Sequence, residues 1–268
     1  MLRKLVAQLP ELRGKQRLLS VLDQLLGPVV MKARGGVFLE GYYSSAQDKS
    51  FLNSQVENER LEEEISTLGE SAVVIDCGAN CGYYSAKAAQ KLGKDGVVIS
   101  VEPSQREYRR LLKAISLNSH QGRWIPINVA AGADNAVVYM NTNVGHTGMN
   151  QVCTRQERTE QVTLQLSIDQ IIDWTIGSRR TIDLIKIDVE GYELNVLKGA
   201  QQALARGQVR LLVVEITESF LQRCGDSKAK LYKFLASLGY ESERNLDIWQ
   251  YDEVFCRSAN QVSNIVCN

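Results

Sequence analysis

The segment D-C-G-A-N-C-G at residues 76–82 has the composition of a loop that closes around a small ligand. It follows an apolar run that predicts a buried strand, and it precedes a predicted helix whose free N–H groups point toward whatever the loop binds. Gly78 and Gly82 let the backbone turn tightly and approach a ligand without a Cβ in the way. Asn80 stands where glycine is common, because Asn tolerates a positive φ. The segment therefore predicts a ligand-binding turn.

The spacing of this loop argues against a dinucleotide. The dinucleotide pattern G-x-G-x-x-G, counted from Gly78, would place Asn80 and Tyr83 at its second and third glycines. Asp76, two residues before the first glycine, instead suits a cofactor that carries positive charge, such as a sulfonium with an α-amino group. We predict that Asp76, Gly78, Asn80 and Gly82 bind such a cofactor.

A carboxylate at the end of the next predicted strand supports this interpretation. Glu102 precedes Pro103, which disfavours helix at Glu102, and Ser104 with Glu107 forms a candidate capping box for the following helix. Ligands of open α/β sheets bind beyond the carboxyl ends of the strands. An acid there can accept both hydroxyls of an adenosine ribose, so Glu102 joins the predicted cofactor site. The alternative is a structural turn with an unrelated surface carboxylate.

A second group of charged residues interrupts another apolar strand. Lys186 and Asp188 lie two residues apart and therefore on one face of that strand. Burying an unpaired charge is costly, so the pattern indicates an ion pair or a polar cleft. Glu190 and Glu193 follow at the same strand end, and Glu215 ends the next apolar run. Their convergence with the loop at one sheet edge favours a functional site, and a purely structural Lys–Asp pair is the alternative.

Alternating strands and helices must position both groups. Continuous apolar runs predict buried parallel strands with helices between them, which is the pattern of right-handed βαβ units. We therefore predict an α/β fold with a Rossmann-like sheet and flanking helices. The predicted strands are 72–75, 97–101, 124–129, 136–140, 162–166, 182–187 and 209–214, with edge strands at 240–244, 248–251 and 254–257. The predicted helices are 83–92, 104–117, 191–205 and 218–238. Residues 1–50 are expected to form a mainly helical N-terminal extension, and residues 51–268 the main domain.

Composition narrows the classes of function. The 268 residues include 31 basic and 31 acidic ones, so no global positive field favours nucleic acid. No stretch reaches the roughly 20 apolar residues of a membrane span, and the first apolar run is too short for a signal-peptide core. Six cysteines without such a signal predict reduced thiols in the cytoplasm. Cys77 and Cys81 have a metal-like spacing, but no second Cys/His pair follows, so small packing residues are the preferred interpretation.

The two segments together resemble the FkbM-type family of S-adenosylmethionine-dependent methyltransferases. The matching pieces are Val74–Ser85, Val101–Pro103, Leu166–Asp169, Ile185–Glu193 and Leu197–Ala200. The resemblance covers about residues 50–240. It implies a seven-stranded methyltransferase sheet, S-adenosylmethionine as cofactor, and methylation of oxygen, often on sugars or secondary metabolites. One departure is that Ala130-Ala131-Gly132 stand where family members often have an acid, so main-chain groups near 129–131 are expected to contact the adenine.

If the chain is such a methyltransferase, each charged residue at this strand end has an expected role. Asp188 is the first candidate for substrate-side chemistry, as the base beside the acceptor hydroxyl. Lys186 and Glu215 are expected to assist it, and Glu190 and Glu193 to bind substrate.

The loop at 141–148 offers a second candidate base, His146, although a lone loop histidine is more often simply exposed to solvent. Asp188, Glu190, Glu215 and His146 also carry oxygen and nitrogen atoms that a divalent metal would accept. The sequence fixes no mutual geometry for them, and we predict no metal.

The expected activity is transfer of a methyl group from S-adenosylmethionine to a hydroxyl of a small molecule or glycan. The rivals are a non-catalytic nucleoside-cofactor-binding protein and a nicotinamide-dependent oxidoreductase, whose glycine pattern the chain violates. A base-methylating enzyme is disfavoured, because residues 188–191 lack the Asn/Asp-Pro-Pro-Tyr motif. Sugar, lipid, peptide and polyketide hydroxyls all stay open as acceptors. We expect no nucleic-acid partner, and the leucine-rich stretch 2–26 offers a surface for a homo-oligomer.

Overall fold

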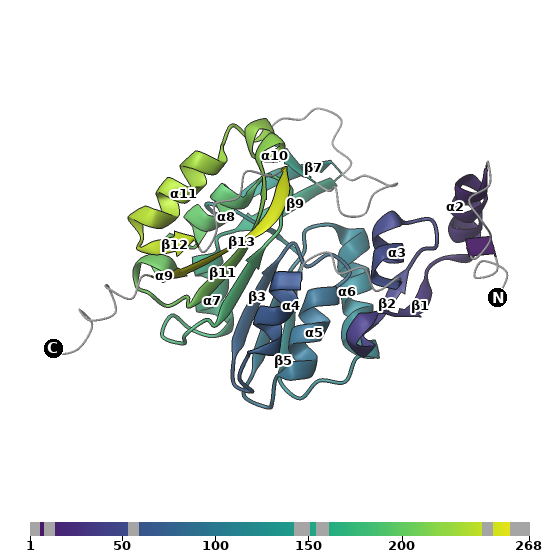
Figure 1. Ribbon diagram of the computed structural model, residues 1–268, viewed down its shortest axis with the longest axis horizontal. Helices are drawn as coiled ribbons and strands as arrows, with labels where there is room; N and C mark the ends of the chain where they lie inside the picture. The colour runs from purple at the N-terminus through teal and green to yellow at the C-terminus, as the bar shows by residue number, and fades with distance from the viewer. Residues whose placement is uncertain are drawn as a thin grey trace.

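The computed structural model describes residues 6–7, 14–52, 59–141, 151–153, 161–242 and 249–257. Its centre is a seven-stranded sheet in the order β12-β13-β11-β10-β3-β4-β5 (Figure 1). Strand β13 runs antiparallel to both of its neighbours, and the pairs from β11 to β5 are parallel. The strands are β3 (Val73–Cys77), β4 (Val97–Val101), β5 (Arg123–Ile127), β10 (Leu184–Ile187), β11 (Leu211–Thr217), β12 (Tyr240–Ser242) and β13 (Gln250–Arg257). The predicted seven-stranded, Rossmann-like α/β sheet is confirmed.

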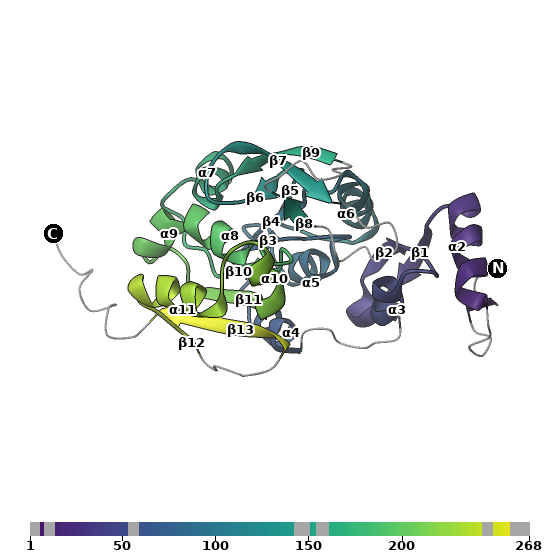
Figure 2. The same cartoon turned by 90° about the horizontal axis from the view of Figure 1, so that it is seen from above.

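Helices cover both faces of this sheet (Figure 2). Side chains of successive strand residues alternate between the faces, so Val74 and Val98 join one apolar cluster, and Ile75 and Ile99 join the other. The first cluster packs under α4 (Glu59–Ser66), α5 (Tyr83–Lys91) and α6 (Gln105–Leu117). The second packs under α7 (Ile168–Thr175), α8 (Glu193–Gly199), α9 (Gln201–Ala205), α10 (Glu218–Arg223) and α11 (Lys228–Ser237). The central strands are therefore buried on both sides, and only their ends are open for chemistry.

Several predicted boundaries are wrong. Residues 191–205 form two helices, α8 and α9. Helix α8 ends at Gly199, which packs so closely on Gly132 that a Cβ there would lie 1.9 Å from the Gly132 carbonyl oxygen. Residues 218–238 also form two helices, because Gly225 adopts a φ of 78° and Ser227 caps a new helix, α11. The two strands expected near 248–257 are one continuous strand, β13, paired along the whole of β11.

A second, four-stranded sheet lies beside the main one. Its strands are β6 (Ala130–Ala131), β7 (Ala136–Asn141), β8 (Gln151–Cys153) and β9 (Gln161–Leu166), in the order β6-β9-β7-β8. The sequence predicts β7 and β9 but not β6, β8 or helix α7. In the part of the chain that the structure describes, no helix is long and apolar enough to cross a membrane.

The N-terminal extension combines helices with a β-hairpin. Its elements are α2 (Lys15–Leu26), β1 (Val29–Lys32), η1 (Arg34–Gly36), β2 (Phe38–Gly41) and α3 (Ala46–Leu52). The expected boundary at residue 50 falls inside α3. Strand β2 packs against α6 of the main domain, so the extension is built onto the domain that it precedes.

A buried arginine joins the extension to α6. The Arg110 guanidinium, 3% exposed, lies 2.5 Å from Asp48 Oδ1 and 2.7 Å from Glu107 Oε2. Its Nε also donates to the carbonyl oxygen of Glu40 at 3.0 Å. Burial alone would lower the pKa of Arg110, but the neighbouring acidic groups outweigh that effect and raise it, so the guanidinium stays charged.

Replacing Asp48 with Ala should lower the free energy of unfolding by about 3 kcal/mol, because Arg110 stays charged and buried while losing one carboxylate. Chemical denaturation measures the effect. Glu63→Ala is the matched control, since its ion pair with Arg60 is exposed and such pairs contribute about 0–1 kcal/mol. Equal stability of the Asp48→Ala variant and the unmodified protein would contradict the assigned role of Arg110.

Candidate functional site

The centre of the site is the buried ammonium of Lys186. Lys186 on β10 is the register partner of Asp76 on β3, so their side chains leave the sheet side by side. The Nζ of Lys186 lies 3.2 Å from Asp76 Oδ1, 3.2 Å from Asp188 Oδ2 and 3.0 Å from the carbonyl oxygen of Gly78. Of the ion pair and the polar cleft that the sequence left open for Lys186 and Asp188, the ion pair is present, and Asp76 is a third member that the sequence does not reveal.

Lys186 is held in its charged form. Burial lowers the pKa of the amine, but the carboxylates of Asp188 and Asp76 raise it further than burial lowers it, so the net pKa lies above the ordinary value. The ring of Tyr84 lies 5.7 Å from Nζ and adds a cation–π contact. Lys186 therefore serves as a fixed cation rather than as a group that exchanges protons.

A row of polar groups continues from this ion pair across the sheet. Asp76 Oδ2 accepts a hydrogen bond from Ser85 Oγ at 2.6 Å, and Ser85 Oγ lies 2.7 Å from Ser100 Oγ. The indole Nε1 of Trp124 donates to Ser100 Oγ at 2.8 Å. Sequence analysis missed Ser100, although a serine inside the apolar run 97–101 is the signal that could have revealed it. The row fixes the Asp76 carboxylate because each member has a buried partner.

The glycine loop at residues 76–82 adopts the predicted backbone. Asn80 has a φ of 51° and Gly78 a φ of 76°. A Cβ on Gly78 would lie 1.8 Å from the carbonyl oxygen of Asp188, so only glycine permits this approach of the two loops. The N–H groups of Gly78 and Ala79 both donate to the carbonyl oxygen of Val101. The loop is therefore anchored to the ends of the two neighbouring strands.

Glu102 links this loop to the end of β4. One carboxylate oxygen accepts from the N–H of Asn80 at 2.8 Å, and the other accepts from the N–H of Ser104 at 2.7 Å. Burial raises the pKa of Glu102 to about 8, although these N–H groups act in the opposite direction. The capping prediction is half confirmed, because the Ser104 hydroxyl accepts from the N–H of Glu107 while the Glu107 carboxylate pairs with Arg110.

Three acids meet on the other side of Lys186. Asp188, Glu190 and Glu215 each place a carboxylate oxygen within 4.8 Å of the other two. Burial, followed by the charge of Asp188, raises the pKa of Glu190 to about 8, and the same causes raise that of Glu215. Glu190 has a φ of 57°, which is uncommon for a residue with a side chain. The structure thus brings together three of the acids expected on the substrate side.

The fourth acid, Glu193, turns away from that group. It is 1% exposed, and its Oε1 accepts from the N–H of Gly191 at 2.8 Å and from the N–H of Val189 at 3.3 Å. In this arrangement Glu193 holds the shape of the loop that carries Glu190. The other candidate base, His146, lies outside the described residues.

The two cysteines beside the loop face opposite sides of the sheet. Cys77 belongs to the cluster under α7–α11, and Cys81 to the cluster under α4–α6. Both cysteines are buried outside any disulfide, and burial raises the pKa of Cys77. These positions fit the preferred interpretation of both as packing residues.

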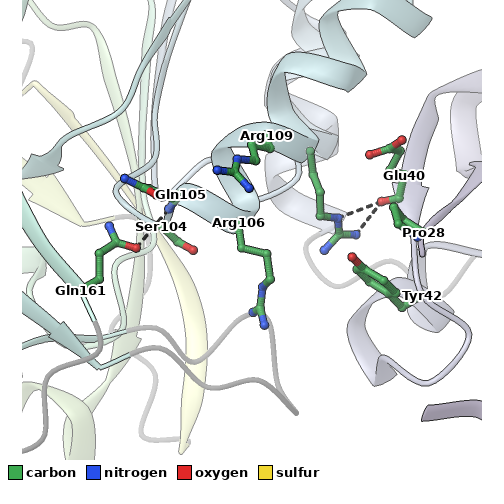
Figure 3. Close-up of a pocket in the computed structure, with 9 residues that line it drawn as sticks. Pro28, Glu40, Tyr42, Ser104, Gln105, Arg106, Arg109 and Gln161 are labelled. Carbon is green, nitrogen blue, oxygen red and sulfur yellow. Dashed lines mark hydrogen bonds between the residues drawn. The ribbon is translucent and has the colours of Figure 1, made fainter. Parts of the chain in front are cut away.

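A pocket of about 500 Å³ opens between the extension and the first turns of α6 (Figure 3). Glu40 and Tyr42 line it from the extension, and Arg106 and Arg109 line it from α6. Ser104, another lining residue, is also the donor to Glu102. The pocket therefore adjoins the predicted ribose-binding acid. It could not be predicted from the sequence, because its walls come from distant segments.

Comparison with known proteins identifies the family. The methyltransferase FkbM domain matches residues 76–242, which is more than half of the chain and spans the loop, Glu102, Lys186 and the acids. The chain belongs to the FkbM methyltransferase family. The family resemblance expected from the sequence is confirmed.

One curated relative of this FkbM-family chain is the hexuronic acid methyltransferase AglP of Haloferax volcanii, which is 26% identical over 148 residues. The match covers 55% of this chain and 56% of the relative, so the chain spans about half the length of the curated relative that it matches.

Solved structures with a similar arrangement include a putative rRNA methylase from Clostridium thermocellum, 12% identical, with a TM-score of 0.47 over 76% of this chain and 98% of that chain. Another is a TehB-like SAM-dependent methyltransferase from Corynebacterium glutamicum, 14% identical, with a TM-score of 0.43 over 80% of this chain and 96% of that chain.

The buried state of Glu102 predicts a pH dependence of stability. Its pKa of about 8 in the folded protein exceeds the roughly 4.3 of an unfolded chain, so the folded state binds the proton more strongly. The stabilising contribution of Glu102 to the free energy of unfolding is therefore fully present below about pH 4, and it is lost as the pH rises through about 8. Glu102→Gln mimics the protonated acid and removes this loss.

Urea denaturation of both proteins from pH 5 to 9 tests the expectation. The free energy of unfolding of the unmodified protein should fall relative to that of Glu102→Gln as the pH rises. A difference between the two proteins that stays constant over this range would contradict it.

Proposed function

We propose that this chain binds S-adenosylmethionine at the Gly78–Glu102 edge and transfers its methyl group to an oxygen of a glycan or small molecule. The observation that carries the proposal is the single Lys186 cation, which joins the cofactor loop at Gly78 to Asp188 on the acceptor side. Membership of the FkbM methyltransferase family supports the same reaction.

The residues at this edge fit the cofactor. Each oxygen of Glu102 accepts one N–H bond and keeps further lone pairs, which is what two ribose hydroxyls require. The Gly78 carbonyl and the Asp188 carboxylate place partial and full negative charge beside the loop, where a sulfonium and an α-amino group are favoured. A pyrophosphate would be repelled by the same groups.

In the proposed reaction the cofactor supplies an electrophilic methyl group, and the chain positions the acceptor oxygen in line with it. Asp188, whose side chain is 36% exposed, is reachable from solvent and accepts the hydroxyl proton. Lys186 fixes its orientation. Glu190, which places a carboxyl oxygen within 4.8 Å of one of Asp188, stands next to it and binds the substrate.

We further propose that the acceptor is an acidic glycan. The relative AglP is named for hexuronic acid, a sugar that carries a carboxylate. The pocket beside Glu102 presents the guanidinium groups of Arg106 and Arg109 (Figure 3), and arginine suits carboxylates because it can form two parallel hydrogen bonds. Glu40 and Tyr42 in the same pocket offer partners for sugar hydroxyls.

Cofactor binding separates the proposal from the nicotinamide rival. S-adenosylhomocysteine should raise the unfolding temperature of the full chain in a concentration-dependent way, whereas NAD should not. Calorimetry at pH 9, above the raised pKa of Glu102, should give an affinity for S-adenosylhomocysteine that falls about 10-fold or more in Glu102→Gln, because hydrogen bonds to a charged acceptor contribute about 1.5–3 kcal/mol. Binding of NAD in preference to S-adenosylhomocysteine would overturn the proposal.

Transfer itself is tested with isotope-labelled S-adenosylmethionine and paired oligosaccharides that end in glucuronic acid or glucose. Asp188→Asn should lower kcat by about 10²–10⁴-fold, as expected for loss of a general base, and Glu241→Gln on the exposed face of β12 is the matched control. The acidic acceptor should show the lower KM. Cofactor binding without transfer to any acceptor would instead support a non-catalytic binding protein.

A further inference from the structure

The end of β11 carries a carboxylate with an unused oxygen. Glu215 is 9% exposed, and its Oε1 accepts from the amide of Gln250, while its Oε2 is buried without a hydrogen-bond partner among the described residues. Two residues on, and on the same face of the strand, the buried Thr217 hydroxyl also has no partner within the described chain. Buried polar atoms are rarely left in this state, because each costs about 1–3 kcal/mol. Glu215 therefore offers a buried acceptor oxygen to a ligand at the end of β11.

The neighbours of Glu215 are also acids. One oxygen each from Asp188, Glu190 and Glu215 lies within 4.8 Å of the other two. Within the part of the chain that the structure describes, Lys186 forms an ion pair with Asp188, and no salt bridge reaches Glu190 or Glu215. Among the described residues, the Lys186 ammonium is shared between Asp188 and Asp76, and it leaves Glu190 and Glu215 without a cationic partner.

The spacing and the donor type fit a hard divalent cation. Calcium binds carboxylate oxygens at about 2.3–2.6 Å, so oxygens on opposite sides of the ion lie about 4.6–5.2 Å apart. Magnesium binds at about 2.0–2.1 Å and needs only a small contraction of the group. Carboxylate-only sites favour magnesium, manganese and calcium over zinc or copper. We propose that Asp188, Glu190 and Glu215 bind one such cation.

The proposed cation site goes beyond methyl transfer, and its existence does not depend on that reaction. Three protein ligands leave coordination positions for water or for oxygens of a bound molecule. The site includes Asp188 and lies on the side where we place the acceptor.

Manganese is the probe, because its unbound form gives a strong electron paramagnetic resonance signal. The full-length protein is stripped with EDTA, dialysed and titrated with Mn²⁺ alone, without cofactor or acceptor. We expect one Mn²⁺ per chain and a higher unfolding temperature in its presence. Glu215→Gln and Glu190→Gln should each weaken binding about 10-fold or more, whereas Glu241→Gln on β12 should bind as the unmodified protein does.

Thermal unfolding in the absence of metal shows that each variant is folded before binding is compared. Two results would overturn the proposal. The first is no stoichiometric uptake of Mn²⁺ by the unmodified protein, which would leave the three acids to share protons instead. The second is unchanged affinity in both Glu215→Gln and Glu190→Gln. Binding of S-adenosylhomocysteine is measured separately, so failure of the cation site leaves the proposed methyl transfer intact.

Discussion

The burial of one ammonium group at a sheet edge is the constraint on which this structure depends. An unpaired charge at the position of Lys186 would be prohibitively costly, so the chain must supply anions from several directions. It does so with Asp76 from β3, Asp188 from the end of β10, and the Gly78 carbonyl from the loop. Meeting this requirement fixes three separate segments relative to one another. The geometry of the site follows from that requirement.

The same cation divides the edge into two chemical environments. On the β4 side, Glu102 and the backbone of the glycine loop offer hydrogen-bond acceptors suited to a ribose and a positively charged cofactor. On the β11 side, the acidic side chains of Asp188, Glu190 and Glu215 lie close together, next to the place where an acceptor would lie. Gly78 stands between them, and its missing Cβ is what allows the two loops to touch. The proposed cofactor and acceptor sites are thereby held in contact by backbone as well as by charge.

The sequence predicts those parts of the fold and site that depend on local pattern. Apolar runs are enough to predict the parallel strands. The charges that interrupt the apolar run at 182–187 are enough to indicate that Lys186 and Asp188 form a pair or line a polar cleft. The register between β3 and β10, which makes Asp76 the partner of Lys186, depends on long-range pairing and cannot be read from one segment. The same holds for Arg110 and Asp48, which are 62 positions apart. Glu193 shows a further limit, because composition cannot tell whether a carboxylate faces a ligand or its own loop.

A double-mutant cycle on Asp76 and Lys186 tests the central interaction most directly. The free energies of unfolding of the unmodified protein, Asp76→Asn, Lys186→Met and the double variant are measured by chemical denaturation. Each single change should cost about 3–5 kcal/mol, because it leaves a buried charge without its partner. The double variant should cost less than the sum by at least about 1 kcal/mol. Effects that add to within about 0.5 kcal/mol would show that the two groups do not interact, and the account of the site would fail.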